Sequence, residues 1–132
     1  EKLKFLQEKI ESFGVPCLVV QTDVTQLKSV QKLFSEVKKH FSSVDIFINN
    51  AGIGRFSDLR NTSLKDWKET LDTNLTGVFY CTQEAVQQML DMKTAGHIIT
   101  VSSVLGLIAL PGRSAYCASK HGVTGFKRAL RF

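Results

Sequence analysis

Long apolar runs are missing from this sequence of 132 residues. The longest apolar stretches span about seven positions, as at 104–110, whereas a helix needs roughly 18 apolar residues to cross a bilayer. No charged segment followed by an apolar one opens the chain, so no secretory leader is indicated. We therefore expect a soluble, unprocessed protein with no membrane span. The chain is also too short for two ordinary domains.

Cysteine is scarce: the sequence has three, and they lie far apart at Cys17, Cys81 and Cys117. The odd number and the wide spacing argue against a disulfide framework. No C-x-x-C pair and no histidine at metal-ligand spacing indicates a zinc site, so no metal is expected. Scattered free cysteines are typical of a reducing compartment, and the expected location is cytoplasmic.

Charge of one sign is in modest excess, because 17 Lys and Arg oppose 12 Asp and Glu for a formal net charge of +5. The basic residues are scattered, and aromatic residues do not alternate with them as they do on many nucleic-acid-binding surfaces. We expect these basic side chains to cover solvated helix faces. Nucleic acid is therefore not an expected partner.

The apolar residues alternate between helical and strand-like spacing along the chain. Helices are expected over 3–13, 25–41, 63–90 and 114–132, and buried strands over 17–22, 46–49 and 97–101. Thr25 and Ser63 are the expected caps of the second and third helices. Strands separated by helices require crossover connections, so the sequence predicts an α/β fold. Its architecture is expected to be a Rossmann-like doubly wound parallel sheet, with three strands and four helices present.

Ligands of such sheets bind beyond the carboxyl ends of the strands, here just after Thr22, Asn49 and Val101. A dinucleotide-binding half opens with a strand and a Gly-rich turn, but this chain begins within a predicted helix and has no G-x-G-x-x-G. Gly52 and Gly54 follow a strand but lead into a loop, so they are not the expected pyrophosphate turn. We interpret residues 1–132 as a single partial Rossmann-fold domain of a longer chain.

Tyr116 and Lys120 lie at positions i and i+4 of the last predicted helix, and so on one face. A phenol ordinarily has a pKa of about 10, so it carries protons poorly near neutral pH unless a positive charge favours the phenolate. Lys120 can supply that charge, although this pair is also common on ordinary amphipathic helices. Ser102 and Ser103 follow a strand, where a serine hydroxyl either donates to a substrate oxygen or forms a turn.

Taken together, the motifs resemble the short-chain dehydrogenase/reductase family, in its simple dehydrogenase form. The resemblance runs over about 15–131, in family order and spacing. Its motifs are Asp23-Val24, Asn49-Asn50-Ala51-Gly52, Asn74, Ser103 and Tyr116-Cys117-Ala118-Ser119-Lys120. A Y-x-x-x-K pattern alone is weak evidence for this family, whereas the complete set of motifs is specific to it.

The resemblance implies an NAD(P)-dependent oxidoreductase that interconverts a ketone and a secondary alcohol. Tyr116 would be its general acid or base, Ser103 would bind the substrate oxygen, and Lys120 would hold the nicotinamide ribose. Asn74 would hold a water that links the lysine to solvent. The implied cofactor is NADP or NAD, with NADP favoured. The implied cofactor-binding residues are Asp23, Val24, Asn50, Ala51, Gly52, Tyr116 and Lys120.

Three parts of the family pattern are missing from 1–132: the T-G-x-x-x-G-x-G turn, the residue that selects NAD or NADP, and the C-terminal substrate lobe. We therefore expect activity of the parent protein, and little or none of this piece alone. The resemblance also implies a homodimer or homotetramer. Two alternatives stay open: a β-ketoacyl carrier-protein reductase, and a non-catalytic binding or truncated member of the fold. An epimerase or dehydratase is less favoured.

Overall fold

The computed structural model describes residues 2–130, which form five α-helices and a two-stranded sheet. The helices are α1 (Lys2–Glu11), α2 (Leu27–Phe41), α3 (Leu64–Leu71), α4 (Gly77–Asp91) and α5 (Ser114–Ala129). The strands are β1 (Ile46–Asn49) and β2 (His97–Thr100). Short helical segments are η1 (Leu59–Asn61), η2 (Asp72–Thr76) and η3 (Val104–Gly106). The predicted α/β class is confirmed.

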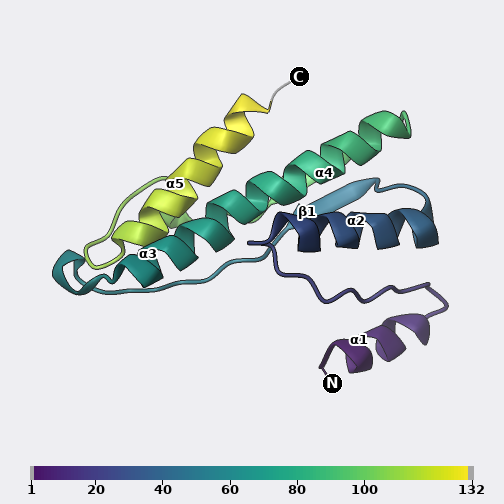
Figure 1. Ribbon diagram of the computed structural model, residues 1–132, viewed down its shortest axis with the longest axis horizontal. Helices are drawn as coiled ribbons and strands as arrows, with labels where there is room; N and C mark the ends of the chain where they lie inside the picture. The colour runs from purple at the N-terminus through teal and green to yellow at the C-terminus, as the bar shows by residue number, and fades with distance from the viewer. Residues whose placement is uncertain (1, 131–132) are drawn as a thin grey trace.

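The two strands run parallel, in a register that pairs Ile46 with His97 and Asn49 with Thr100. The chain leaves β1 and continues through α3 and α4 (Figure 1), with η2 between these two helices, and then returns in β2, which pairs with β1. This is the crossover that parallel pairing requires. The carboxyl ends of both strands therefore lie at one edge of the sheet, where the residues after Asn49 and Thr100 meet.

The predicted strand at 17–22 is wrong, because this segment has no regular secondary structure. Its β-branched residues favour extended backbone, but a strand also needs a neighbour that completes the hydrogen-bonded ladder. Within residues 2–130, β1 and β2 pair only with each other. The segment instead joins α1 to α2 as an irregular connection (Figure 1), and the Gln7 side chain donates to the Cys17 carbonyl at 3.1 Å.

The core lies between α2, α4 and one face of the sheet. Val30 and Phe34 of α2 pack with Cys81 and Ala85 of α4, and each of the four is at most 5% exposed. The Phe47 ring of β1 lies 5.4 Å from the Phe34 ring, centre to centre. Burial raises the pKa of the Cys81 thiol to about 11, so this cysteine is a protonated packing residue near neutral pH.

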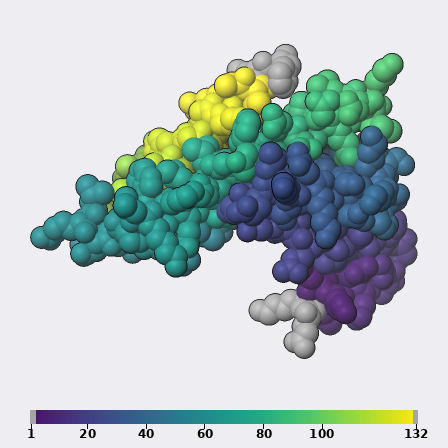
Figure 2. All heavy atoms as spheres, in the orientation of Figure 1, coloured from purple at the N-terminus to yellow at the C-terminus, as the bar shows by residue number. Residues whose placement is uncertain are grey.

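Two apolar surfaces, one on the sheet and one on and near α1, are exposed to solvent in this structure. The face of the sheet away from the helices carries Ile46, Ile48, Ile99 and Val101, which are 47% to 62% exposed. α1 forms where the apolar spacing predicted it, but Leu3, Leu6 and Phe13 are 49% to 75% exposed. In the space-filling view, α1 lies at the margin of the molecule (Figure 2). No helix among residues 2–130 is long and apolar enough to cross a membrane.

The helix starts follow the predictions in part. Ser63 caps α3 as predicted, since its hydroxyl oxygen accepts the Asp66 N–H at 2.9 Å and its O–H donates to the Asp66 carboxylate at 2.7 Å. Thr25 does not cap α2, because Gln26 precedes that helix and the Thr25 hydroxyl donates to the Asp23 carboxylate instead. α5 ends at Ala129, and the last two positions of the predicted final helix lie outside the described residues.

Gly106 brings η3 against α5 so closely that no side chain fits between them. A Cβ at this position would lie 2.7 Å from the Lys120 carbonyl oxygen and 2.9 Å from the Thr124 hydroxyl. We expect Gly106→Ala to lower the free energy of unfolding of the full-length protein by about 1–3 kcal/mol, because backbone must move. Urea unfolding followed by circular dichroism measures this change.

Gly125 provides the matched control for this substitution, because it lies on α5 with nothing within 4 Å of the position that a Cβ would take. Gly125→Ala is expected to leave the free energy of unfolding unchanged or to raise it by up to about 1 kcal/mol, as alanine favours a helix. Equal free energies of unfolding for the two variants would show that the space between η3 and α5 at Gly106 can hold a methyl group.

Candidate active site

α5 places Tyr116 and Lys120 side by side at the carboxyl end of β2. The Lys120 ammonium donates to the Val101 carbonyl at 3.0 Å and lies 5.7 Å from the centre of the Tyr116 ring. Lys120 is only 6% exposed, and this burial lowers the pKa of its ammonium from the ordinary value. An ammonium has three N–H donors, and within the described residues only one is used. The other two are available to a ligand.

The Tyr116 hydroxyl, in a half-buried side chain, has no hydrogen-bond partner among residues 2–130. It is therefore available for proton exchange with a bound molecule. The pairing of a phenol with an ammonium on one helix face is the arrangement that the i, i+4 spacing predicted. Both side chains lie beside the connection that follows β2, where ligands of parallel sheets bind.

Asn74 is fully buried in η2, a π-helical segment that separates α3 from α4. Its Oδ1 accepts the Ile53 N–H at 2.8 Å, and its Nδ2 donates to the Ile53 carbonyl at 2.8 Å and to the Ser119 hydroxyl at 3.1 Å. A Cβ at Gly52 would lie 3.4 Å from Asn74 Oδ1 and 3.7 Å from Lys120 Nζ. The asparagine therefore joins the loop after β1 to α5, next to the lysine.

Ser103 caps η3, where its hydroxyl oxygen accepts the Leu105 N–H at 3.1 Å. Within the described residues it donates to no neighbour, so its proton remains available to a substrate oxygen. Its neighbour Ser102 lies 3.4 Å from the Thr124 hydroxyl of α5. Both roles considered for this serine pair, turn formation and donation to a ligand, are compatible with the arrangement.

The residues expected to bind the cofactor are only partly brought together. Val24, Asn50 and Ala51 line one cavity of about 150 Å³ at the carboxyl end of β1. Asp23 is exposed and is not among the lining residues of this cavity. Hydrogen bonds from the Thr25 hydroxyl and backbone N–H lower the pKa of the Asp23 carboxyl from its usual value.

Asn49, the first asparagine of the Asn-Asn-Ala-Gly motif, has a structural role. It is 7% exposed, and its amide donates to the Thr82 hydroxyl of α4 at 2.9 Å and to the Thr100 hydroxyl of β2 at 3.3 Å. These bonds tie β1 to the helix that covers it and to the neighbouring strand. The motif therefore combines one buried asparagine with exposed residues, Asn50 to Gly52, that face the edge of the sheet.

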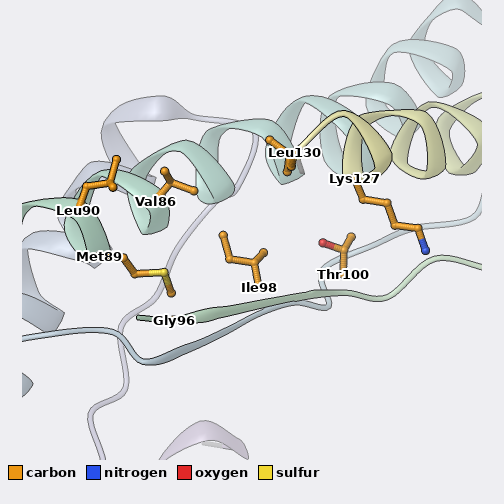
Figure 3. A pocket seen from close by; sticks show the side chains of 8 residues that line it. All are labelled: Val86, Met89, Leu90, Gly96, Ile98, Thr100, Lys127 and Leu130. Carbon is orange, nitrogen blue, oxygen red and sulfur yellow. The ribbon is translucent and has the colours of Figure 1, made fainter. Parts of the chain in front are cut away.

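A larger cavity of about 560 Å³ lies between α4, β2 and α5 (Figure 3). Its lining is apolar except for a threonine and a lysine, and consists of Val86, Met89, Leu90, Gly96, Ile98, Thr100, Lys127 and Leu130. None of the site residues predicted from the sequence lines it. Size alone therefore does not identify the site, because the functional candidates gather beyond the carboxyl end of β2 and do not line this cavity.

Several contributors to the site were not singled out from the sequence. The Val101 carbonyl orients Lys120, and the Ile53 backbone and the Ser119 hydroxyl hold Asn74. Sequence motifs are defined by side chains, so they do not reveal which backbone groups will form these hydrogen bonds. Ser119 lies inside the Y-x-x-x-K pattern, between the two residues that define it, so only that position hinted at its role.

Comparisons with known proteins agree with this architecture. A family model described as short chain dehydrogenase matches residues 1–132. The chain is 39% identical over 129 residues to the 3-oxoacyl-[acyl-carrier-protein] reductase FabG of Staphylococcus aureus, covering 98% of this chain and 52% of the relative. A 3-oxoacyl-[acyl-carrier-protein] reductase of Synechocystis is 39% identical over 117 residues, covering 89% of this chain and 47% of the relative.

Among solved structures, a short-chain type dehydrogenase/reductase from Mycobacterium marinum superposes with a TM-score of 0.91 at 32% sequence identity, covering 97% of this chain and 51% of the other. The chain therefore belongs to the short-chain dehydrogenase/reductase family, and its fold is Rossmann-like. It spans about half the length of the curated relatives that it matches.

Proposed function

We propose that the full-length protein is an NAD(P)-dependent oxidoreductase that interconverts a ketone and a secondary alcohol. The observation that carries this proposal is the pair of Tyr116, whose hydroxyl has no hydrogen-bond partner among residues 2–130, and Lys120, whose buried ammonium lies 5.7 Å from the centre of the Tyr116 ring. In carbonyl reduction, Tyr116 donates its phenolic proton to the substrate oxygen, and in alcohol oxidation it takes that proton back. The neighbouring positive charge stabilises the phenolate between these steps.

Ser103 and Asn74 complete the proposed machinery. Ser103 donates its hydroxyl proton to the carbonyl oxygen of the substrate, which orients that oxygen and stabilises the negative charge that develops on it. Asn74 holds the loop after β1 against α5, and so fixes the surroundings of Lys120. A water held beside Asn74 would connect the ammonium to solvent and return the proton used in each turnover.

The residues present fit the sugar end of a nicotinamide cofactor. Lys120 keeps two ammonium donors that no described group accepts, as two ribose hydroxyls require. Small residues at the edge of the sheet let a ligand approach the backbone, and the proposed contacts there are Asp23, Val24, Asn50, Ala51 and Gly52. When bound, NADP or NAD supplies or accepts the hydride. A homodimer or homotetramer is part of the same proposal.

A second candidate is reduction of β-ketoacyl thioesters carried by an acidic carrier protein. It is favoured by two relatives that are 3-oxoacyl-[acyl-carrier-protein] reductases, both 39% identical to this chain, and the net charge of +5 is compatible with an acidic partner. The same four residues would act in this reaction. A catalytically silent member of the fold is less favoured, because Asn74, Ser103, Tyr116 and Lys120 are all in place.

The two enzymatic candidates differ in the substrate that they prefer. Initial rates of NADPH and NADH oxidation by the full-length protein should be measured with a free β-ketoester and with the matching carrier-bound β-ketoacyl group. A general ketone reductase is expected to use the free ester at least as well. A carrier-protein reductase is expected to prefer the bound form by at least about tenfold in kcat/KM. Oxidation of neither cofactor with either substrate contradicts both candidates.

A further inference from the structure

The Tyr116 ring has a second close neighbour, Phe56, which lies in the connection between β1 and α3. The centres of the two rings are 5.5 Å apart and their planes meet at 78°, which is an edge-to-face contact. Aromatic pairs favour this arrangement because the positive edge of one ring meets the negative face of the other. No motif singles out Phe56, and the proposed function assigns it no role.

Phe56 is itself held in place from two sides. The Arg113 guanidinium carbon lies 4.3 Å from the centre of the Phe56 ring, a cation–π contact between two connections that flank the site. On another side the ring packs against Gly54, where a Cβ would lie 2.6 Å from Phe56 Cζ. A residue larger than glycine at position 54 would displace the ring.

The residues on either side of Phe56 fix the backbone that carries it. Arg55 forms ion pairs with Asp66 at 3.7 Å and Glu69 at 3.3 Å, both on α3. Ser57 donates its backbone N–H to the Gly112 carbonyl at 3.0 Å, next to Arg113. The connection is thus fastened to α3 on one side of Phe56 and to the segment before α5 on the other.

We propose that Phe56, held by Arg113, is a positioning residue that fixes the Tyr116 ring for proton transfer. This inference rests on the proposed function, in which Tyr116 exchanges a proton with the substrate. Phe56 lies edge to face against the Tyr116 ring and restricts its rotation about the side-chain bonds, while the Lys120 ammonium lies 5.7 Å from the ring centre. A reacting group displaced by about 1 Å can lose on the order of 100-fold in rate, so small ring movements matter.

The substitution Phe56→Ala in the full-length protein tests this role. Phe56 is 54% exposed, so its removal takes little from the core, and the variant is expected to fold. We expect kcat for carbonyl reduction to fall about tenfold, while KM for the cofactor and for the ketone stays within about twofold. Phe56→Tyr keeps the ring, and is expected to restore kcat to within about threefold of the original protein.

Two further variants test the specificity of the contact. Leu59→Ala removes an apolar side chain, 77% exposed, from the same connection, and is expected to leave kcat unchanged. Arg113→Ala is expected to lower kcat less than Phe56→Ala does, because the ring remains. Combined with Phe56→Ala, it is expected to add no further loss, since both changes remove the same support.

A normal kcat for Phe56→Ala would overturn the inference. An increase in KM for the ketone with kcat unchanged would also overturn it, because Phe56 would then contact the substrate instead of positioning Tyr116. The proposed function fails separately, and Tyr116→Phe measured alongside distinguishes the two failures. Normal turnover by Tyr116→Phe would overturn the proposed function itself. An inactive Tyr116→Phe beside a fully active Phe56→Ala would leave that function standing and remove only the positioning role.

Discussion

Tyr116→Phe is expected to lower kcat of the full-length protein on the order of 1,000-fold, because it removes the hydroxyl that exchanges a proton with the substrate. The substitution deletes one atom and keeps the ring. The edge-to-face contact with Phe56 and the position beside Lys120 therefore remain. The dissociation constant for the nicotinamide cofactor, measured by fluorescence titration, is expected to stay within about threefold, since phenol proton transfer plays no part in binding.

Tyr80→Phe provides the control for the loss of a phenolic hydroxyl. Tyr80 lies on α4 and packs against the core through its ring rather than beside Lys120. Its variant is expected to keep kcat within about twofold. If Tyr116→Phe and Tyr80→Phe turned over at the same rate, Tyr116 would not be the proton donor.

Asn74→Ala is expected to lower the free energy of unfolding by about 3 kcal/mol, because a fully buried amide with three hydrogen bonds is lost. The Ile53 N–H and carbonyl lose their partner, and the space left beside them is not filled. Since the amide also joins the loop after β1 to α5, kcat is expected to fall even where the variant is folded. Urea unfolding and initial rates measure the two effects.

Asn61→Ala is the matched control for this loss of an amide, because Asn61 is exposed at the end of η1. Its expected change in the free energy of unfolding is below about 0.5 kcal/mol. Similar changes in the two variants would mean that the buried hydrogen bonds of Asn74 add nothing beyond an ordinary amide at the surface.

Local patterns predicted the elements that local interactions decide. The apolar stripe of α2 and the Ser63 cap of α3 depend on residues three or four positions apart, and both were predicted correctly, although the expected Thr25 cap of α2 was not. Strand 46–49 was also predicted correctly, because its ladder partner lies within the chain at 97–100. The i, i+4 pair of Tyr116 and Lys120 is local in the same sense.

Features that depend on distant partners could not be predicted in this way. Residues 17–22 have strand-like composition, but no neighbouring strand in the described chain pairs with them. The predicted helix over 63–90 is interrupted by η2, where Asn74 turns inward to bond Ile53 and Ser119. The signal available in the sequence was an asparagine in the middle of a predicted helix, where this residue is unfavourable. π-Helical segments are frequent at functional sites.

The site itself also combines residues that local motifs predict with residues that only distant contacts bring there. The family motifs contain Asn74, Ser103, Tyr116 and Lys120, but not the residues that hold them. Phe56 lies against Tyr116, and Arg113 lies against Phe56; the two come from separate connections, and only the folded arrangement brings them together. The three-dimensional structure was therefore needed to find the contacts that position the tyrosine.

Isotope labelling can show whether the full-length protein transfers a hydride between the nicotinamide and the substrate. The full-length protein would be incubated with a β-ketoester and with NADPH or NADH deuterated at C4 of the nicotinamide, on either face, and the alcohol product analysed by mass spectrometry and NMR. We expect deuterium from one of the two labelled faces to appear on the carbinol carbon of the product. Alcohol product that carries no deuterium from either face, or the absence of any alcohol product with both cofactors, would contradict it.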